Sequence, residues 1–199
     1  THNTGADNSH ATIDNDYAVK FAASSVDGDL DVTATTGDIT QTGALAITGT
    51  TTLLTSADGA DIDLSTTTNA FTGALTITTN DNTDYEAHAT IDGGTTALII
   101  AASTIDGNLT LTSGHNNSTG HAITDSGTVT LGGNLSATTD ANNGNITLDQ
   151  LALASGKTIA LITNDDAGDN TGHATVKNTT ALNLALSTID GNFSGTATN

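Results

Sequence analysis

The feature that most constrains this chain is a sequence block that occurs three times. The copies read HATIDNDYAVKFAASSVDGDLDV, HATIDGGTTALIIAASTIDGNLTL and HATVKNTTALNLALSTIDGNFSG, and they begin at His10, His88 and His173. A long, nearly constant interval is the signature of a stacked repeat architecture. The copies start 78 and 85 residues apart, which predicts one solenoid of two units, residues 3–81 and 82–165, and a partial third, residues 166–199.

Within each unit the local pattern is that of β-strands. Segments such as GDLDV, GALAI, GNLTL and GNITL alternate apolar with polar or small residues, and Gly, Asn or Asp separates them. Comparison of the copies predicts which positions point inward: Val19, Leu98 and Leu182; Phe21, Ile100 and Leu184; and also Leu30, Val32, Leu109 and Leu111. Between the first two sets stand Lys20, Ile99 and Asn183, a mixture that only an outward position tolerates.

The spacing of these short segments predicts an all-β fold, a parallel β-helix (β-solenoid) of about ten coils. Strand-like segments recur about every 15 to 20 residues, so a unit would hold roughly four coils and the rod would be near 50 Å long. Thr, which makes up about a fifth of the chain, suits stacked strands because it is β-branched. The alternative is a string of β-sandwich domains, which the absence of Trp and Pro disfavours.

The charge balance limits the class of partner. The formal net charge is -19, from 22 acidic residues and 3 lysines. Binding to a phosphate backbone needs basic residues, so we expect no nucleic acid partner. Such a surface repels itself, favours solubility and attracts divalent cations. No apolar run is long enough to cross a membrane, and we expect no membrane insertion of this segment.

The histidine that opens each copy invites a metal hypothesis, which the expected spacing disfavours. Copies four coils apart would lie about 19 Å from each other, whereas metal–ligand bonds are about 2 Å long. We therefore interpret the three histidines as structural residues that satisfy a turn. The aspartates that precede a glycine in the same block are interpreted as tight turns: Asp27, Asp106 and Asp190.

The acidic loops before each histidine are the better candidate for a metal site. ADNSH, NDNTDYEAH and NDDAGDNTGH place six carboxylates in comparable loops, namely Asp7, Asp81, Asp84, Asp165, Asp166 and Asp169. Oxygen ligands in a loop are what calcium requires, so calcium is the candidate cofactor. The alternative is that these acids are solvated turn residues, since neither an EF-hand loop nor a glycine-rich nonapeptide is present.

The string GDLDVTATTGDITQTGALAITGTTTLLTSADGADIDLSTTTNAFTGALTIT, followed after a spacer by TTALIIAASTIDGNLTLT, resembles the repeats of large bacterial surface proteins. These are the filamentous-haemagglutinin-like and autotransporter-adhesin proteins. HAITDSGTVTLGGNLSATTDANNGNITLDQLALASG is similar to the same repeats. The resemblance implies a right-handed parallel β-helix, export from the cell, and a place at the cell surface or in the extracellular matrix.

These observations together lead us to expect a non-enzymatic structural protein, a stalk or filament subunit. The third copy ends without a polar cap, so the expected partners are copies of the chain end to end, or further repeats of the same chain. The alternative is an adhesin module that binds host or matrix glycans, or calcium, on its lateral face. A carbohydrate-active enzyme is the least favoured class, because a lyase of this shape needs a cationic group and the chain has no Arg.

Overall fold

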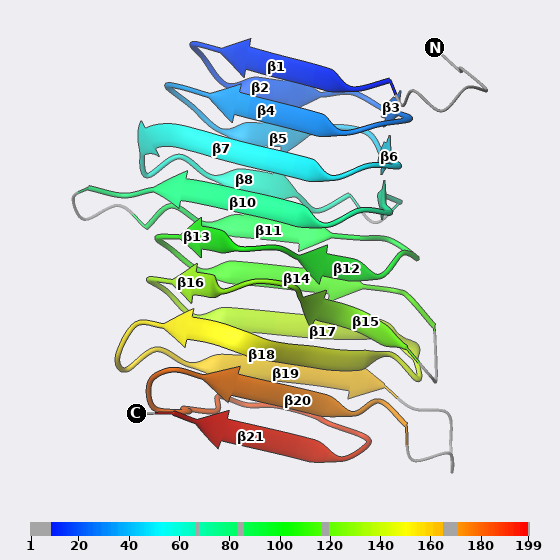
Figure 1. Cartoon of the computed structure of the whole chain (residues 1–199), viewed down its shortest axis with the longest axis vertical. Helices are drawn as coiled ribbons and strands as arrows, with labels where there is room; N and C mark the ends of the chain where they lie inside the picture. The colour runs from blue at the N-terminus through cyan, green and yellow to red at the C-terminus, as the bar shows by residue number, and fades with distance from the viewer. Residues whose placement is uncertain (1–8, 67, 83–85, 117–119, 165–170, 199) are drawn as a thin grey trace.

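The alternating segments fold into the strands of a parallel β-solenoid (Figure 1). The structure, a computed structural model, describes residues 9–66, 68–82, 86–116, 120–164 and 171–198, and every regular element within them is a strand. The all-β solenoid prediction is therefore confirmed. In the same residues there is no helix with the length and hydropathy needed to cross a membrane.

The strands form three parallel sheets, which we call A, B and C. Sheet A has eleven strands: β1 (Ala11–Asn15), β4 (Leu30–Ala34), β7 (Thr51–Asp58), β10 (Leu75–Asn80), β12 (Leu98–Ile100), β13 (Ser103–Ile105), β15 (His121–Asp125), β16 (Val129–Leu131), β18 (Asn145–Leu153), β20 (Ala174–Asn178) and β21 (Phe193–Ala197). Sheet B has seven: β2 (Val19–Phe21), β5 (Ile39–Gln41), β8 (Ile62–Leu64), β11 (Ala89–Asp92), β14 (Leu109–Ser113), β17 (Leu135–Asn142) and β19 (Ile159–Asn164). Sheet C has three: β3 (Ser24–Val26), β6 (Leu45–Ile47) and β9 (Ala70–Phe71).

The solenoid makes about eight coils, a coil being one full turn of the chain. This is fewer than the ten expected, because each coil is longer than the strand spacing suggested. Stacked partners are 19 residues apart at Ala11 and Leu30 but 28 apart at Ile146 and Ala174. The extra residues are accommodated in the loops between strands, and eight coils at the usual strand spacing give a rod of about 40 Å.

The three sequence copies do not start on the same side of the rod. His10 precedes β1 in sheet A, His88 precedes β11 in sheet B, and His173 precedes β20 in sheet A again. Three full coils run from β1 to β10, and β11 follows half a coil later, so one copy is about three and a half coils long. The expected spacing of roughly four coils is therefore half a coil too long, and successive copies are related by a half turn.

The half turn exchanges the roles of the two main faces. In the first copy the longer strands β4, β7 and β10 lie in sheet A and face pairs of short strands in sheets B and C. In the second copy the longer strands β14, β17 and β19 lie in sheet B, and the short pairs β12–β13 and β15–β16 belong to sheet A. The same sequence therefore forms the same local structure on whichever side it lies.

One aliphatic core runs through the rod between the sheets. The predicted inward residues are buried in the first two copies: Val19, Phe21, Leu30, Val32, Leu98, Ile100, Leu109 and Leu111 are at most 8% exposed. Lys20, at the outward position, is exposed. The exceptions lie in the third copy, where Leu182 is half-buried and Leu184 is 45% exposed. Both belong to the last coil of the described chain, where only one neighbouring coil covers them.

Candidate functional site

Each histidine that opens a copy connects two successive coils. Its Nδ1 atom accepts a hydrogen bond from the backbone N–H of a residue in the next coil: Asp29 to His10 at 2.9 Å, Asn108 to His88 at 2.9 Å, and Asn192 to His173 at 2.8 Å. The structural interpretation of the three histidines is confirmed. A ring nitrogen that accepts a backbone N–H is not available to a metal, and the half turn places His88 on a different sheet from the other two histidines.

The histidines belong to a larger series of residues at the position just before a strand. On sheet B the side chain at this position accepts the backbone N–H of its counterpart one coil later. The bonds are Asp61 N–H to Asp38 (2.9 Å), His88 N–H to Asp61 (2.7 Å), Asn108 N–H to His88 (2.9 Å), Asn134 N–H to Asn108 (2.7 Å) and Thr158 N–H to Asn134 (2.9 Å). We call this series the sheet B ladder. It joins six consecutive coils with side-chain hydrogen bonds that run beside the backbone hydrogen bonds.

Sheet A carries two shorter series of the same kind, one at each end of the rod. Asp29 N–H donates to His10, and Thr50 N–H donates to Asp29 at 2.7 Å. Acceptance from the Thr50 N–H and hydroxyl holds the pKa of the Asp29 carboxyl below its usual value. At the other end His173 N–H donates to Asn145 at 2.8 Å, and Asn192 N–H donates to His173. We call these the sheet A ladders.

At Gly107 and Gly191, the glycine after the block aspartate serves close packing between coils rather than an unusual backbone angle. A Cβ atom at Gly107 would lie 2.5 Å from the His88 ring nitrogen and 2.6 Å from the Ala87 carbonyl oxygen. Among the described residues the glycines with positive φ are Gly59, Gly94, Gly156 and Gly172. The interpretation of the Asp-Gly pairs as turns therefore explained too little at these two positions, because the contact with the preceding coil is what requires glycine there.

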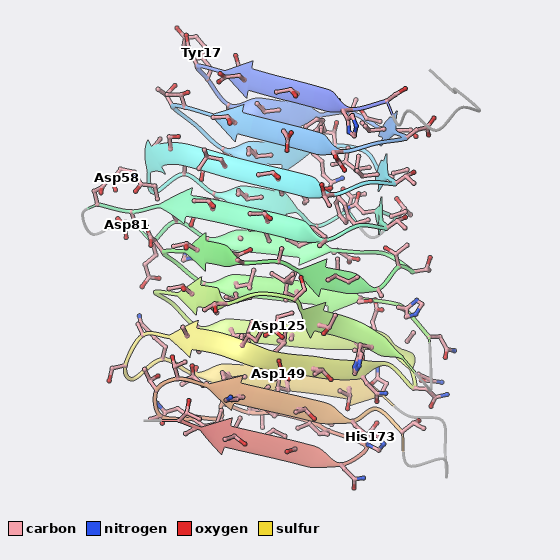
Figure 2. The ribbon with its side chains drawn as sticks, viewed as in Figure 1. Tyr17, Asp58, Asp81, Asp125, Asp149 and His173 are labelled. Atoms are coloured by element: carbon pink, nitrogen blue, oxygen red, sulfur yellow. The ribbon has the colours of Figure 1, made fainter. Side chains whose placement is uncertain are left out.

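The calcium hypothesis falls mostly outside the described residues. This applies to Asp7, Asp84, Asp165, Asp166 and Asp169. Asp81 is described, and it lies at the same edge of the rod as Asp58 (Figure 2). Its backbone N–H donates to Asp106 Oδ2 at 2.8 Å. No group of three or more His, Cys, Asp or Glu side chains that could hold a metal occurs within the described ranges, so calcium binding stays a prediction.

Two aspartates that the sequence did not single out are buried. Asp92 and Asp125 are each 7% exposed, and burial raises the pKa of both carboxyls. Asp92 accepts the Gly94 N–H at 2.7 Å, and Asp125 accepts the backbone N–H groups of Asp149 and Gln150 at 3.1 and 2.9 Å. Asp125 and Asp149 lie on neighbouring strands of sheet A (Figure 2). Because backbone donors hold these carboxylates, both residues fix loop and strand geometry.

Buried side chains also form the corners of the rod. Asn69 Oδ1 accepts the Leu45 N–H at 2.8 Å, and its Nδ2 donates to the Leu64 and Asp92 carbonyls at 3.2 and 3.0 Å. Asn178 plays the same part in a later coil, where its Oδ1 accepts the Leu153 N–H at 3.0 Å. Both asparagines are at most 2% exposed. No common local sequence pattern marks these corners, because Asn69 follows a run of Ser and Thr whereas Asn178 follows Lys177.

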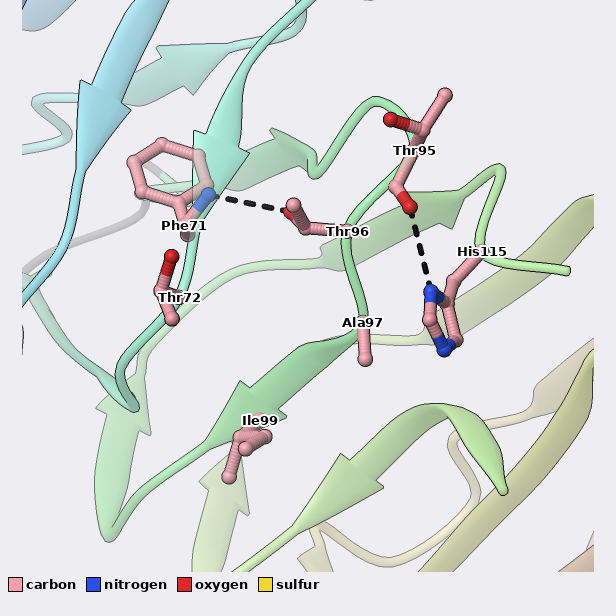
Figure 3. A pocket seen from close by; sticks show the side chains of 7 residues that line it. All are labelled: Phe71, Thr72, Thr95, Thr96, Ala97, Ile99 and His115. Atoms are coloured by element: carbon pink, nitrogen blue, oxygen red, sulfur yellow. Dashed lines mark hydrogen bonds between the residues drawn. The ribbon is translucent and has the colours of Figure 1, made fainter. Parts of the chain in front are cut away.

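A depression of about 300 Å³ lies on the side of the rod beside the loop that enters β12 (Figure 3). It is lined by Phe71, Thr72, Thr95, Thr96, Ala97, Ile99 and His115. The Phe71 N–H donates to Thr96 Oγ1 at 3.1 Å, and His115 Nδ1 lies 3.2 Å from the Thr95 carbonyl oxygen. The Phe71 side chain is only 1% exposed, so its ring offers no stacking surface. The lining, with its methyl and hydroxyl groups, suits a small neutral group.

Comparison with known proteins adds one similarity. A family model described as repeats of unknown function (DUF5649) matches residues 8–78, which is little more than a third of the chain. This supports the interpretation of the chain as a repeat protein. No curated protein and no solved structure matches it.

Proposed function

We propose that this chain is a non-enzymatic structural protein, a rigid stalk or filament segment at the cell surface or in the extracellular matrix. The observation that carries the proposal is the continuous connection of coil to coil along the rod. Every pair of neighbouring coils shares parallel backbone pairing, one aliphatic core runs throughout, and the sheet B ladder adds a side-chain bond at five successive steps.

Such a rod resists bending and proteolysis because no inner strand of a sheet can leave without breaking bonds on both sides. Its formal charge of -19 keeps neighbouring rods apart in solution. The resemblance to the repeats of filamentous-haemagglutinin-like and autotransporter-adhesin proteins supports the location outside the cell. The family match to repeats of unknown function is compatible with this role.

The proposed function has two separable tests. Small-angle scattering of the purified chain is expected to give a rod about 40 Å long, and limited proteolysis is expected to spare residues 86–116 and 120–164. Immunogold labelling of the producing cells is expected to mark the surface or the surrounding matrix. Label confined to the cell interior would reject the proposed location, and rapid cleavage within these coils would reject the mechanical role.

A second candidate function is a module that binds glycans on its lateral face. The depression beside β12 is the observation that favours it, because Thr95, Thr96 and His115 place hydroxyl and imidazole groups around an apolar floor that includes Ile99. Glycan-array binding that is lost in His115→Ala would favour this function. A glycan-array signal that His115→Ala leaves unchanged would place binding elsewhere.

A further inference from the structure

His88 is a ladder residue whose hydrogen bond depends on its protonation state. Its Nδ1 atom accepts the Asn108 N–H at 2.9 Å, and a ring nitrogen accepts a hydrogen bond only while it carries no proton. The single proton of the neutral ring is therefore on Nε2. A second proton goes to Nδ1, and two N–H groups then face each other between β11 and β14, which are neighbours in sheet B (Figure 1).

Backbone hydrogen bonds join the same two coils on either side of this contact. The Gly107 N–H donates to the Ala87 carbonyl at 2.8 Å, and the Ala89 N–H donates to the Asn108 carbonyl at 2.9 Å. Together with the contact to His88 they form one step between coils, which we call the His88 step. Opening of this step exposes the amides of Ala89, Gly107 and Asn108 to solvent together.

The charged groups near the ring do not distinguish the closed step from the open one. Glu86 Oε2 lies 4.0 Å from His88 Nε2, and Asp61, one coil earlier, accepts the His88 N–H at 2.7 Å. Both carboxylates stay on the His88 side of the step, so they favour protonation in both states. Lys157 Nζ lies 3.9 Å from Glu86 Oε1, and such an exposed pair contributes little. What separates the two states is the Asn108 contact, which only the neutral ring makes.

The equivalent step at His10 is built so that a proton does not break it. The Asp29 N–H donates to His10 Nδ1 at 2.9 Å, and Asp29 Oδ2 lies 3.1 Å from the same nitrogen. Because Oδ1 of Asp29 accepts from Thr50, Oδ2 faces the position that a proton on the ring would occupy. In the second copy Asn108 stands in place of Asp29, and its single side-chain oxygen already accepts the Asn134 N–H at 2.7 Å.

We propose that the His88 step is an acid-sensitive joint of the rod. Histidine side chains ordinarily gain a proton as the pH falls from about 8 to about 5. The contact with Asn108 needs the neutral ring, so it stabilises the closed step at the upper end of this range and is lost as the pH falls. At His10 an ion pair with Asp29 replaces the lost hydrogen bond. The inference goes beyond the proposed structural function, whose tests do not involve pH.

Native-state hydrogen exchange at about pH 8 and about pH 5 tests the proposal. Each rate is divided by the rate of the same amide in an unstructured peptide at that pH, because acid slows the exchange of every amide. The expected result is a protection factor about 5 to 30 times lower at the acidic pH for the amides of Ala89, Gly107 and Asn108. Circular dichroism at both pH values checks that the rod stays folded.

Two variants change the response of the joint to acid. His88→Asn supplies an amide oxygen that does not titrate, and it is expected to remove the pH effect at the Ala89 and Gly107 amides. Asn108→Asp copies the arrangement at Asp29, because the second carboxylate oxygen can accept the proton on the ring. It is expected to reduce the loss of protection at the same two amides.

His121→Ala is the matched control, because it removes an imidazole from another part of the rod, and it is expected to keep the full pH effect. Equal protection factors at both pH values in the original chain would overturn the proposal. The same loss of protection in His88→Asn as in the original chain would overturn it as well. A rod that is rigid and surface-located by scattering and immunogold labelling, but insensitive to acid at this step, would reject the joint and leave the stalk function in place.

Discussion

Replacement of His88 by alanine is expected to weaken the rod locally at the next coil. The Asn108 N–H, which donates to His88 Nδ1 at 2.9 Å, then has no protein acceptor. A buried donor left unpaired costs about 1–3 kcal/mol. The His88 side chain is 39% exposed, so water reaches the site and satisfies the donor in part. We therefore expect a loss of about 1–2 kcal/mol in the local free energy of opening.

Two further variants separate the ladder contact from a general effect of removing a histidine. His88→Asn restores an acceptor, because Asn108 and Asn134 use Oδ1 in this way at the next two steps of the sheet B ladder. We expect it to behave like the original chain. His121→Ala is the matched control, because the His121 ring contacts the Thr147 hydroxyl at 2.9 Å and, among the described residues, no backbone N–H. It is expected to leave the Asn108 amide unchanged.

Native-state hydrogen exchange at the Asn108 amide is the direct assay. A loss of about 1–2 kcal/mol corresponds to exchange about 5 to 30 times faster in His88→Ala. Urea unfolding followed by circular dichroism gives the accompanying change for the whole rod. Equal exchange in His88→Ala and the original chain would refute the reasoning, as would an equally large effect of His121→Ala.

Three other perturbations follow from the same structure. Gly107→Ala places a methyl group 2.5 Å from the His88 ring nitrogen. Calorimetry should show a drop in Tm of about 2–8 °C, and hydrogen exchange at the Asn108 amide should become faster. The control is Gly156→Ala, in open space at φ +82, which should leave exchange at the Asn108 amide unchanged. Asp92→Asn removes a buried carboxyl whose pKa is raised mainly by burial. This carboxyl destabilises the fold increasingly as pH rises above its ordinary pKa of 3.8, and fully above the folded pKa, so Tm of the variant should be higher by up to about 4 °C at neutral pH and the gain should vanish as pH falls to 3.8 and below. If the loop that begins at Asp81 binds calcium, a chelator should lower Tm in low salt, and an unchanged Tm rejects the calcium hypothesis.

The sequence predicted the strands and their inward faces because both follow from local alternation. Leu30 and Val32 alternate with Asp31, and burial of the first two, with Asp31 exposed, is what the pattern requires. The number of coils could not be predicted in the same way, since a coil closes wherever stacked partners meet. Ala11 meets Leu30 after 19 residues, but Ile146 meets Ala174 only after 28, and no local pattern marks that difference.

The ladders were within reach of the sequence but were not predicted. Asp38, Asp61, Asn108 and Asn134 each stand directly before an Ile or Leu that begins a strand, which is a recurrent signal. The signal is interrupted at the third member, His88, because an imidazole stands there in place of a carboxylate or an amide. The buried aspartates Asp92 and Asp125 carried no such signal, because their burial depends on neighbouring coils far away in the sequence.

The half turn between copies affects how such a rod can change length in evolution. A duplication that adds one copy lengthens the rod by about 17 Å, the height of three and a half coils, and turns everything beyond the insertion to the opposite side. Two added copies restore the original orientation. A surface substitution that spreads through the array by gene conversion therefore appears on one side of the rod in one copy and on the opposite side in the next. A long array of identical copies thus has two sides that are alike. A binding surface on one side alone needs copies that differ from their neighbours.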